Sequence, residues 1–532
     1  MEWVLASAPS GGEFPVELLL TELIIIATVA IFVKYVRLPY TIALVAAGLG
    51  MGVLRAQHYL ELDLRLTPEL VFTIFLPALL FEAAFNLHVT HLRENVKPIL
   101  LLAVPGVVGA ALIVGYALHA WLGMPLEAAL VFGALISATD PISVLALFKQ
   151  LRAPGRLSLL VEGESLLNDG AAVVVFKILL ALALTGTFSP AAGFIEFLLV
   201  AVGGFLLGLA LGILTSQLTA LVDDHLIEIT LSSILAYGSY LLAERLGVSG
   251  VMAVIAAGLV LGNYGSRIGM SPKTQVMMKA FWDYAGFLMN SLVFLLIGTQ
   301  VDLRLLAERW QLVLAAFAVV LLARACVVLV LSPLGGWMDR RPIPLRWQAL
   351  MVWAGLRGSI SMALAIGLPL DVDWRENMIL MTFGVVIMSL FLQGLTISPL
   401  MRRLHIGSTP SAVLDYERTL GRLLVHERAC QELERQRARY HITEEVHEAL
   451  IGPHRAAMDE LGKKLRELGN DQPEIREELM RDARHNVSVA QMSTLYDAHT
   501  RGMISAEVLD ELVAELAATR DSPPPPEDQG SG

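Results

Sequence analysis

Cysteine and charged residues are both scarce in this sequence. Only Cys326 and Cys430 occur among 532 residues, and Asp, Glu, Lys and Arg together make up 17%. Two cysteines so far apart do not suggest a disulfide framework, and no His/Cys cluster has the spacing of a zinc site. The sequence also has no phosphate-binding glycine loop, so ATP-driven and redox chemistry lack support. We therefore expect no cofactor.

Long apolar runs take the place of the missing charge. Hydrophobic residues make up 55% of the chain, and the mean hydropathy is +0.63. Runs of about 20 apolar residues, the length that crosses a bilayer, recur along the sequence. We predict about thirteen transmembrane helices, at 17–36, 39–56, 67–86, 98–121, 126–149, 158–184, 193–219, 226–245, 249–266, 278–300, 310–333, 347–369 and 377–401. The expected fold is an all-α polytopic membrane protein embedded in the lipid bilayer.

The character of the chain changes after residue 403. The segment from 404 onward holds 15 of the 39 Lys and Arg but 24 of the 50 Asp and Glu. We expect a transmembrane domain at 1–403, a cytosolic helical regulatory domain at 404–520 with breaks at 452–453 and 469–473, and a disordered tail at 521–532. Neither part has the basic patch of a nucleic-acid-binding protein, so no nucleic-acid partner is expected.

The short loops predict how the chain is oriented in the membrane. An odd number of spans places the two termini on opposite sides. With the C-terminus in the cytoplasm, the inside loops carry 15 Lys and Arg and the outside loops carry 6. Because cytoplasmic loops carry the excess of basic residues, we expect the N-terminus outside and the C-terminus in the cytoplasm. The compact core and short loops favour a plasma (cell) membrane.

Ionisable residues interrupt two consecutive spans. The fifth contains the sequence Ser-Ala-Thr-Asp-Pro at 137–141, and the sixth contains Gly-Glu-Ser-Leu-Leu-Asn-Asp-Gly at 163–170. They place Asp140, Glu164 and Asp169 inside apolar runs. A carboxylate at the centre of a membrane helix costs about 2.5–3.5 kcal/mol on insertion scales, so such residues usually mark an ion or proton pathway.

The two polar stretches offer oxygen ligands for a small cation. Pro141 lacks an N–H group and clashes with the preceding turn, so the backbone around Thr139 should unwind. Ser165 and Asp169 are four residues apart and therefore share a helix face. Carboxylate, hydroxyl and freed carbonyl oxygens suit a hard cation. A carboxylate at such a site can hold a proton or a cation, each expelling the other, which is the minimum requirement for antiport.

A second interruption lies in the twelfth predicted span. The sequence Gly-Leu-Arg-Gly-Ser at 355–359 breaks that span as the polar stretch at 137–141 breaks the fifth. If the thirteen spans divide as six, one and six, these two spans correspond. Corresponding breaks in two halves suggest inverted repeats with broken crossing helices near the midplane of the membrane.

Two arginines and one further acid lie inside predicted spans. Arg324 and Arg357 each need an acidic partner, because an unpaired guanidinium in a membrane is as costly as an unpaired carboxylate. Glu164 is a candidate partner for one of them. Glu82, within the third span, has no evident partner.

The motifs at 137–141, 163–170 and 355–360, with the Leu76-Pro77…Glu82 stretch, resemble the sodium/proton exchanger family in its NhaP- and NHE-like branch. The resemblance covers about 10–403. It implies a homodimer that moves by an elevator mechanism and serves pH homeostasis. Asp169 would be the principal ion- and proton-binding residue.

The resemblance also implies roles for the neighbouring residues. Asp140, Thr139 and Ser165 would complete the ion site, and Asn168 and Pro141 would support it. Related electrogenic exchangers have a second Asp at the position of Asn168, so Asn implies electroneutral exchange of one cation for one proton. Arg324 would pair with Glu164. Arg357 and Glu82 would have secondary roles, with Arg357 structural or regulatory.

Several alternatives remain open at this point. Sodium or lithium is the expected substrate, but potassium/proton exchange would use the same ligand types. An intramembrane aspartyl protease also has one Asp on each of two successive spans, although the Gly-x-Gly-Asp sequence expected around the second Asp is absent here. The tail after 403 could bind a regulatory ligand or protein. We expect a transporter rather than an enzyme.

Overall fold

The computed structural model describes residues 16–35, 39–56, 66–186, 190–222, 224–407, 411–439 and 442–471, with isolated positions between 487 and 512. Every regular element in these residues is helical. The chain divides between Ser408 and Thr409 into two compact units, which are described separately. The tail at 521–532, predicted to be disordered, lies outside the described residues.

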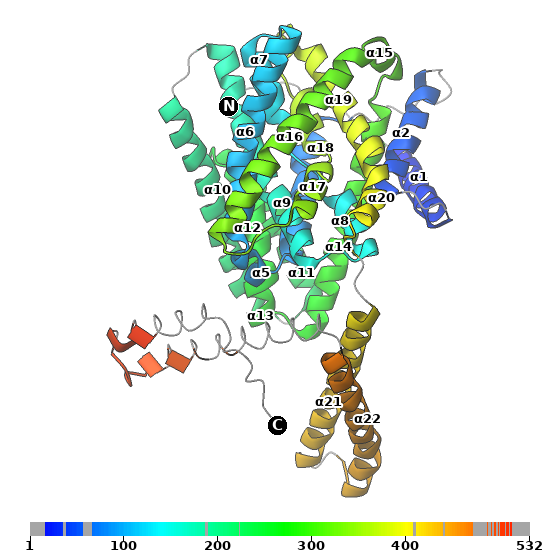
Figure 1. The fold of residues 1–532 in the computed structure, drawn as a ribbon, viewed down its shortest axis with the longest axis vertical. Helices are drawn as coiled ribbons and strands as arrows, with labels where there is room; N and C mark the ends of the chain where they lie inside the picture. The colour runs from blue at the N-terminus through cyan, green and yellow to red at the C-terminus, as the bar shows by residue number, and fades with distance from the viewer. Residues whose placement is uncertain are drawn as a thin grey trace, which may run out of the picture. The chain divides into compact units, whose positions relative to one another are not determined.

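Within the described part of the first unit, eight helical segments are long and apolar enough to cross a membrane (Figure 1). Six of them are single helices: α6 (Val96–Leu122), α9 (Gly155–Thr185), α10 (Pro190–Thr219), α11 (His225–Arg245), α14 (Pro272–Thr299) and α16 (Trp310–Met338). The other two contain a π-helical turn: α3–η1–α4 (Pro68–Leu70, Val71–Phe75 and Leu76–Asn86) and α19–η3–α20 (Arg375–Met388, Ser389–Gly394 and Leu395–Arg403).

Shorter helices complete this unit. They are α1 (Val16–Tyr35), α2 (Tyr40–Ala56), α5 (Val89–Glu94), α12–η2–α13 (Gly250–Val260, Leu261–Gly265 and Ser266–Ile268) and α15 (Leu303–Glu308). Two further pairs of short helices, described in the next paragraph, account for the remaining predicted spans. Each of the thirteen segments predicted as spans thus contains at least one helix. The unit is therefore an all-helical bundle suited to a membrane.

Both interrupted pairs break at the polar stretches noted in the sequence. The first consists of α7 (Leu126–Leu135) and α8 (Ile142–Leu151), and the second of α17 (Leu345–Trp353) and α18 (Ser359–Ile366). The backbone N–H of Asp140 donates to the carbonyl of Leu356 at 2.8 Å. This bond joins the two breaks directly, so two segments more than 200 residues apart meet at one point.

Close helix packing holds α9 beside these breaks. α9 packs against α6 and α7, and α6 packs against α16. Gly133 permits the close approach of α7 to α6, because a Cβ atom there would lie 2.4 Å from the carbonyl oxygen of Ala111. Small residues at such contacts let membrane helices approach closely and gain packing energy. This core fixes the position of the polar face of α9.

The second unit contains a helical hairpin. Its described helices, α21 (Ser411–Ala438) and α22 (Glu444–Asp471), pack against each other. The break expected at 452–453 is wrong, because α22 continues through Pro453. An interior proline costs about 3 kcal/mol or more; packing of the α22 face that contains buried Ile451 offsets this cost. The structure describes α22 as far as Asp471, and residues 472–473 of the break expected at 469–473 lie outside the described residues.

Candidate functional site

The interruption between α7 and α8 leaves its backbone groups free for other partners. Residues 136–141 are not helical, and Pro141 directly precedes α8. The carboxylate of Asp140 accepts a bond from the backbone N–H of Ile142 at 2.9 Å through its Oδ1 atom. Asp140 therefore stabilises the start of α8 with one oxygen, while Oδ2 remains available to the interior of the protein.

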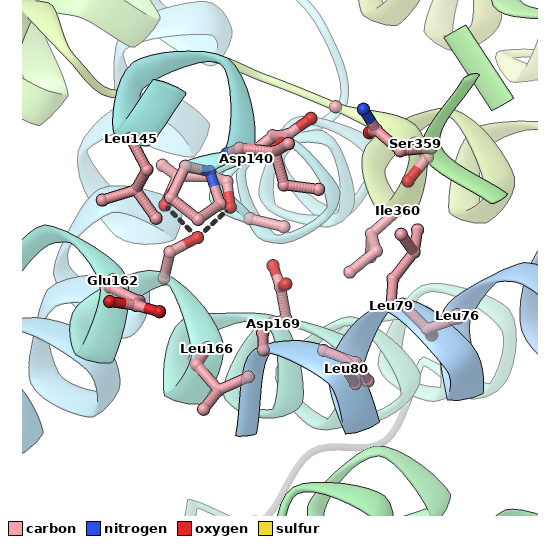
Figure 2. A pocket seen from close by; sticks show the side chains of 18 of the residues that line it. Leu76, Leu79, Leu80, Asp140, Leu145, Glu162, Leu166, Asp169, Ser359 and Ile360 are labelled. Atoms are coloured by element: carbon pink, nitrogen blue, oxygen red, sulfur yellow. Dashed lines mark hydrogen bonds between the residues drawn. The ribbon is translucent and has the colours of Figure 1, made fainter. Parts of the chain in front are cut away.

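One face of α9 lies against this unwound stretch. The Ser165 hydroxyl donates to the carbonyl of Thr139. The Thr139 hydroxyl in turn donates to the Ser165 hydroxyl at 3.4 Å. Figure 2 shows both contacts as dashed lines above α9. Because Asp169 follows Ser165 by one helical turn, it faces the same region. Two segments that are about thirty residues apart thus present their oxygens to a common space.

That space is a cavity of about 250 Å³. The predicted site residues that line it are Glu82, Thr139, Asp140, Pro141, Ser165 and Asp169. In Figure 2 the side chain of Asp169 rises from α9 into the space below Asp140. Asp169 is only 8% exposed, and its Oδ1 atom has no hydrogen-bond partner among the described residues. A buried carboxylate oxygen without a protein partner is well placed to bind a cation or a proton.

Asn168 does not line the cavity. Its Nδ2 atom donates to the carbonyl of Ser137 at 3.3 Å and lies 3.4 Å from the hydroxyl of Thr139. Its side chain is 2% exposed. Asn168 therefore anchors the unwound stretch of the broken helix, and Asp169 beside it is the residue that reaches the cavity.

Glu164 and Arg324 form a buried ion pair. The guanidinium donates through Nη1 to Oε1 of Glu164 and through Nη2 to Oε2 at 2.9 Å. Nη2 also donates to the carbonyl of Met351 at 3.3 Å, next to the break in the twelfth predicted span. The Glu164 side chain is 1% exposed. This two-point contact ties α9 to α16 and leaves the Glu164 carboxylate no access to the cavity.

Arg357 does not follow the expectation that each buried arginine takes an acidic partner. Among the described residues no carboxylate lies within ion-pair distance of it. Instead, its Nη1 atom donates to the carbonyls of Ser137 at 2.8 Å and Ala138 at 3.2 Å. These carbonyls are free because the helix is interrupted there, so their dipoles take the place of a carboxylate. The expectation was wrong because it considered side chains only.

Glu82 reaches the cavity from α4. Its Oε1 atom accepts a bond from Asn86 Nδ2 at 2.8 Å, so the partner that the sequence did not reveal is an amide one turn along the same helix. Gly286 of α14 packs closely against this side chain, since a Cβ atom there would lie 3.0 Å from Glu82 Cγ. Glu82 is thus a third carboxylate beside Asp140 and Asp169.

Four polar lining residues were not identified from the sequence: Glu162, Asn290, Ser359 and Ser361. A signal existed for Glu162, which precedes Ser165 by three residues and Asp169 by seven, the spacing of one helix face. The serines follow the Gly-Leu-Arg-Gly stretch and could have been read as the start of a helix after a break. Asn290 gave no comparable signal, because its position depends on how α14 packs.

The arrangement combines hard oxygen ligands with a membrane-embedded cavity. Carboxylates, hydroxyls and a main-chain carbonyl suit a small monovalent cation, and the unpartnered oxygen of Asp169 fits this use. A helical membrane protein with broken helices crossing at such a cavity belongs to the class of ion transporters.

Comparison with known proteins gives the family. The family model described as sodium/hydrogen exchanger, transmembrane, matches residues 23–403. The chain is 38% identical over 495 residues to the Na⁺/H⁺ antiporter NhaG of Bacillus atrophaeus, covering 91% of this chain and 93% of that protein. It is 41% identical over 398 residues to the antiporter ApNhaP of Aphanothece halophytica, covering 73% and 75%.

A solved structure has the same fold. The sodium proton antiporter MjNhaP1 of Methanocaldococcus jannaschii matches with a TM-score of 0.59 and 21% identity, over 73% of this chain and 98% of that one. The chain belongs to the sodium/hydrogen exchanger family. It is therefore a multi-pass membrane transporter and not an enzyme, so the protease alternative is dismissed.

Proposed function

We propose that this protein is an electroneutral antiporter that exchanges one sodium or lithium ion for one proton. The observation that carries the proposal is the unpartnered oxygen of Asp169 in a cavity shared with Asp140. The relatives named as Na⁺/H⁺ antiporters, which cover most of the chain, support sodium as the cation. The exchange as proposed needs no cofactor.

In this proposal, Asp169 alternates between holding a proton and holding the cation. Asp140, the Thr139 backbone and hydroxyl, and the Ser165 hydroxyl supply the remaining oxygens. Because a bound cation and a bound proton compete for the same carboxylate, each displaces the other. Pro141 keeps the backbone unwound, and Asn168 holds it in place.

The one-to-one stoichiometry is supported by the environment of Asn168. A neutral amide carries no proton at physiological pH. Its Nδ2 atom is bonded to the Ser137 carbonyl, and its side chain does not line the cavity. Of the two adjacent residues, only Asp169 can therefore trade a proton for a cation, and one positive charge would move in each direction.

Larger-scale features belong to the same proposal. We infer thirteen membrane crossings with inverted repeats related as six, one and six, supported by the matched breaks at α7–α8 and α17–α18. We further infer a homodimer with elevator-type movement in the plasma membrane, contributing to pH homeostasis. The N-terminus would lie outside and the C-terminus in the cytoplasm, where the region after 403 would be a regulatory domain.

The test is proton flux in proteoliposomes that contain the purified protein. Pulses of Na⁺, Li⁺ and K⁺ are applied to the wild type and to Asp169→Asn, with and without a clamped membrane potential. In the wild type we expect proton flux driven by Na⁺ and Li⁺ at a rate that does not depend on the membrane potential. In Asp169→Asn this flux should fall at least about 100-fold. Flux driven by K⁺ alone would show that potassium, and not sodium, is the exchanged cation. Full activity of Asp169→Asn would refute the mechanism.

A further inference from the structure

Glu162 occupies a special position on α9. Between residues 160 and 176 of this helix, Glu162 and Leu167 are the two that are not buried. Glu162 lines the same cavity as Asp169 and lies seven residues before it, about 10 Å along the helix axis. Figure 2 shows its carboxylate on the same side of α9, displaced toward the Leu145 side of the cavity. Glu162 thus lies between Asp169 and the Gly155 end of α9.

The Glu162 carboxylate differs from that of Glu164 two residues later. Residues two apart on a helix point to nearly opposite sides. Glu164 is held by Arg324 and is 1% exposed. Glu162, by contrast, has no hydrogen bond or ion pair among the described residues, although it lies in a membrane-spanning helix. A carboxylate that lines the cavity of such a helix without a structural partner has no scaffold role to account for it.

The charges around Glu162 favour attraction of a cation. Glu82 lies across the cavity, close enough for its charge and that of Glu162 to interact. Outside the Asp140–Asp169 pair, the charged residues that line the cavity are Glu82 and Glu162, so this part of its wall is acidic. Asp283 and Lys279 interact with Glu82 from outside the lining. A low-dielectric cavity lined by one sign of charge focuses the field and raises the local concentration of the opposite ion.

We propose that Glu162 is an access residue, which attracts the monovalent cation on its path between the Gly155 end of α9 and the Asp169 carboxylate. This inference rests on the proposed cation exchange. Glu162 raises the occupancy of the site without coordinating the ion at Asp169, so it sets the apparent affinity and leaves the maximal rate and the stoichiometry unchanged.

The experiment measures the KM for Na⁺ and the maximal rate in proteoliposomes for the wild type, Glu162→Gln, Glu162→Asp and the control Glu127→Gln. Glu127 is an exposed acid at the start of α7, outside the cavity. We expect Glu162→Gln to raise KM about threefold to tenfold at an unchanged maximal rate. Glu162→Asp keeps the charge and should restore most of the affinity, and Glu127→Gln should match the wild type.

A salt series separates attraction from a structural effect. Raising the ionic strength with N-methyl-D-glucamine chloride screens long-range charge, so KM of the wild type should rise more steeply than KM of Glu162→Gln, which keeps Glu82 and the site carboxylates. An unchanged KM in Glu162→Gln, or a loss of maximal rate that Glu162→Asp does not restore, would overturn this inference alone. No cation-driven flux in the wild type would overturn the proposed exchange and the inference together.

Discussion

Two faces of the same helix, α9, carry acidic and polar side chains of similar chemistry, but these side chains differ in their hydrogen-bond and ion-pair partners. On the cavity face are Glu162, Ser165 and Asp169, and on the packed face are Glu164 and Asn168. On the packed face, the Glu164 carboxylate is bound to a guanidinium and the Nδ2 atom of Asn168 to main-chain oxygen, whereas the Oδ1 atom of Asn168 has no partner among the described residues. On the cavity face, the unpartnered atom is a carboxylate oxygen, Oδ1 of Asp169, and Glu162 has no hydrogen bond or ion pair among the described residues.

The difference shows that, on one helix, the residues that stabilise the fold can be distinct from the residues that bind the transported ion. A buried polar group that finds its hydrogen-bond partner inside the protein stabilises one arrangement of the helices. A buried oxygen without such a partner is destabilising by itself, and binding of an ion or proton relieves that cost. Variants on the packed face should therefore mainly change stability, and variants on the cavity face should mainly change transport. Asp169→Asn, described above, is the largest expected effect on transport.

Breaking the buried ion pair is the largest expected effect on stability. Glu164→Gln leaves the guanidinium of Arg324 buried without a counter-charge, which costs about 3–5 kcal/mol. The measurement is the thermal unfolding midpoint of purified protein in detergent. The control is the double variant Glu164→Gln/Arg324→Met, which removes both charges and should recover at least half of the loss. A stable Glu164→Gln protein with abolished exchange would instead place Glu164 in the transport machinery.

An intermediate effect is expected for Asn168→Asp on the packed face. The carboxylate cannot donate to the Ser137 carbonyl and would place negative charge beside it, at a cost of about 1–3 kcal/mol. The unfolding midpoint should fall. Because the neutral amide at position 168 supports one-to-one exchange, the remaining exchange in this variant should become dependent on the membrane potential. Flux that is still independent of the potential would contradict the proposed basis of the stoichiometry.

The smallest effect is expected for Ser165→Ala on the cavity face. This variant loses one hydroxyl oxygen from the cavity and one hydrogen bond to the Thr139 carbonyl, typically about 0.5–1.5 kcal/mol. KM for Na⁺ should rise about twofold to tenfold, with the maximal rate retained. Ser165→Thr keeps the hydroxyl and is the matched control. A shift of the unfolding midpoint larger than that of Asn168→Asp would contradict the assignment of Ser165 to the cavity face.

Much of this site could be predicted from local features of the sequence. Pro141 cannot continue a helix, so a break near Thr139 follows from its covalent structure. The four-residue spacing puts Ser165 and Asp169 on one face of any helix. The three-residue spacing from Glu162 to Ser165 carries the same information and places Glu162 on that face as well.

The partners of the arginines could not be predicted in the same way. Arg324 meets a residue 160 positions away, and Arg357 meets carbonyls about 220 positions away. Whether a guanidinium finds a carboxylate or a main-chain oxygen depends on where two broken helices cross. That crossing is determined by the packing of α6, α7, α9 and α16, and no local pattern encodes it.

The sequence by itself determined the membrane-embedded helices, the sites of their breaks and the periodic faces, because hydropathy, proline geometry and the helical repeat are local properties. The tertiary structure alone decided which face of α9 lines the cavity and which polar groups there keep no protein partner. The physical reason is that hydrogen-bond satisfaction depends on distances between helices, and these arise only when the whole bundle packs.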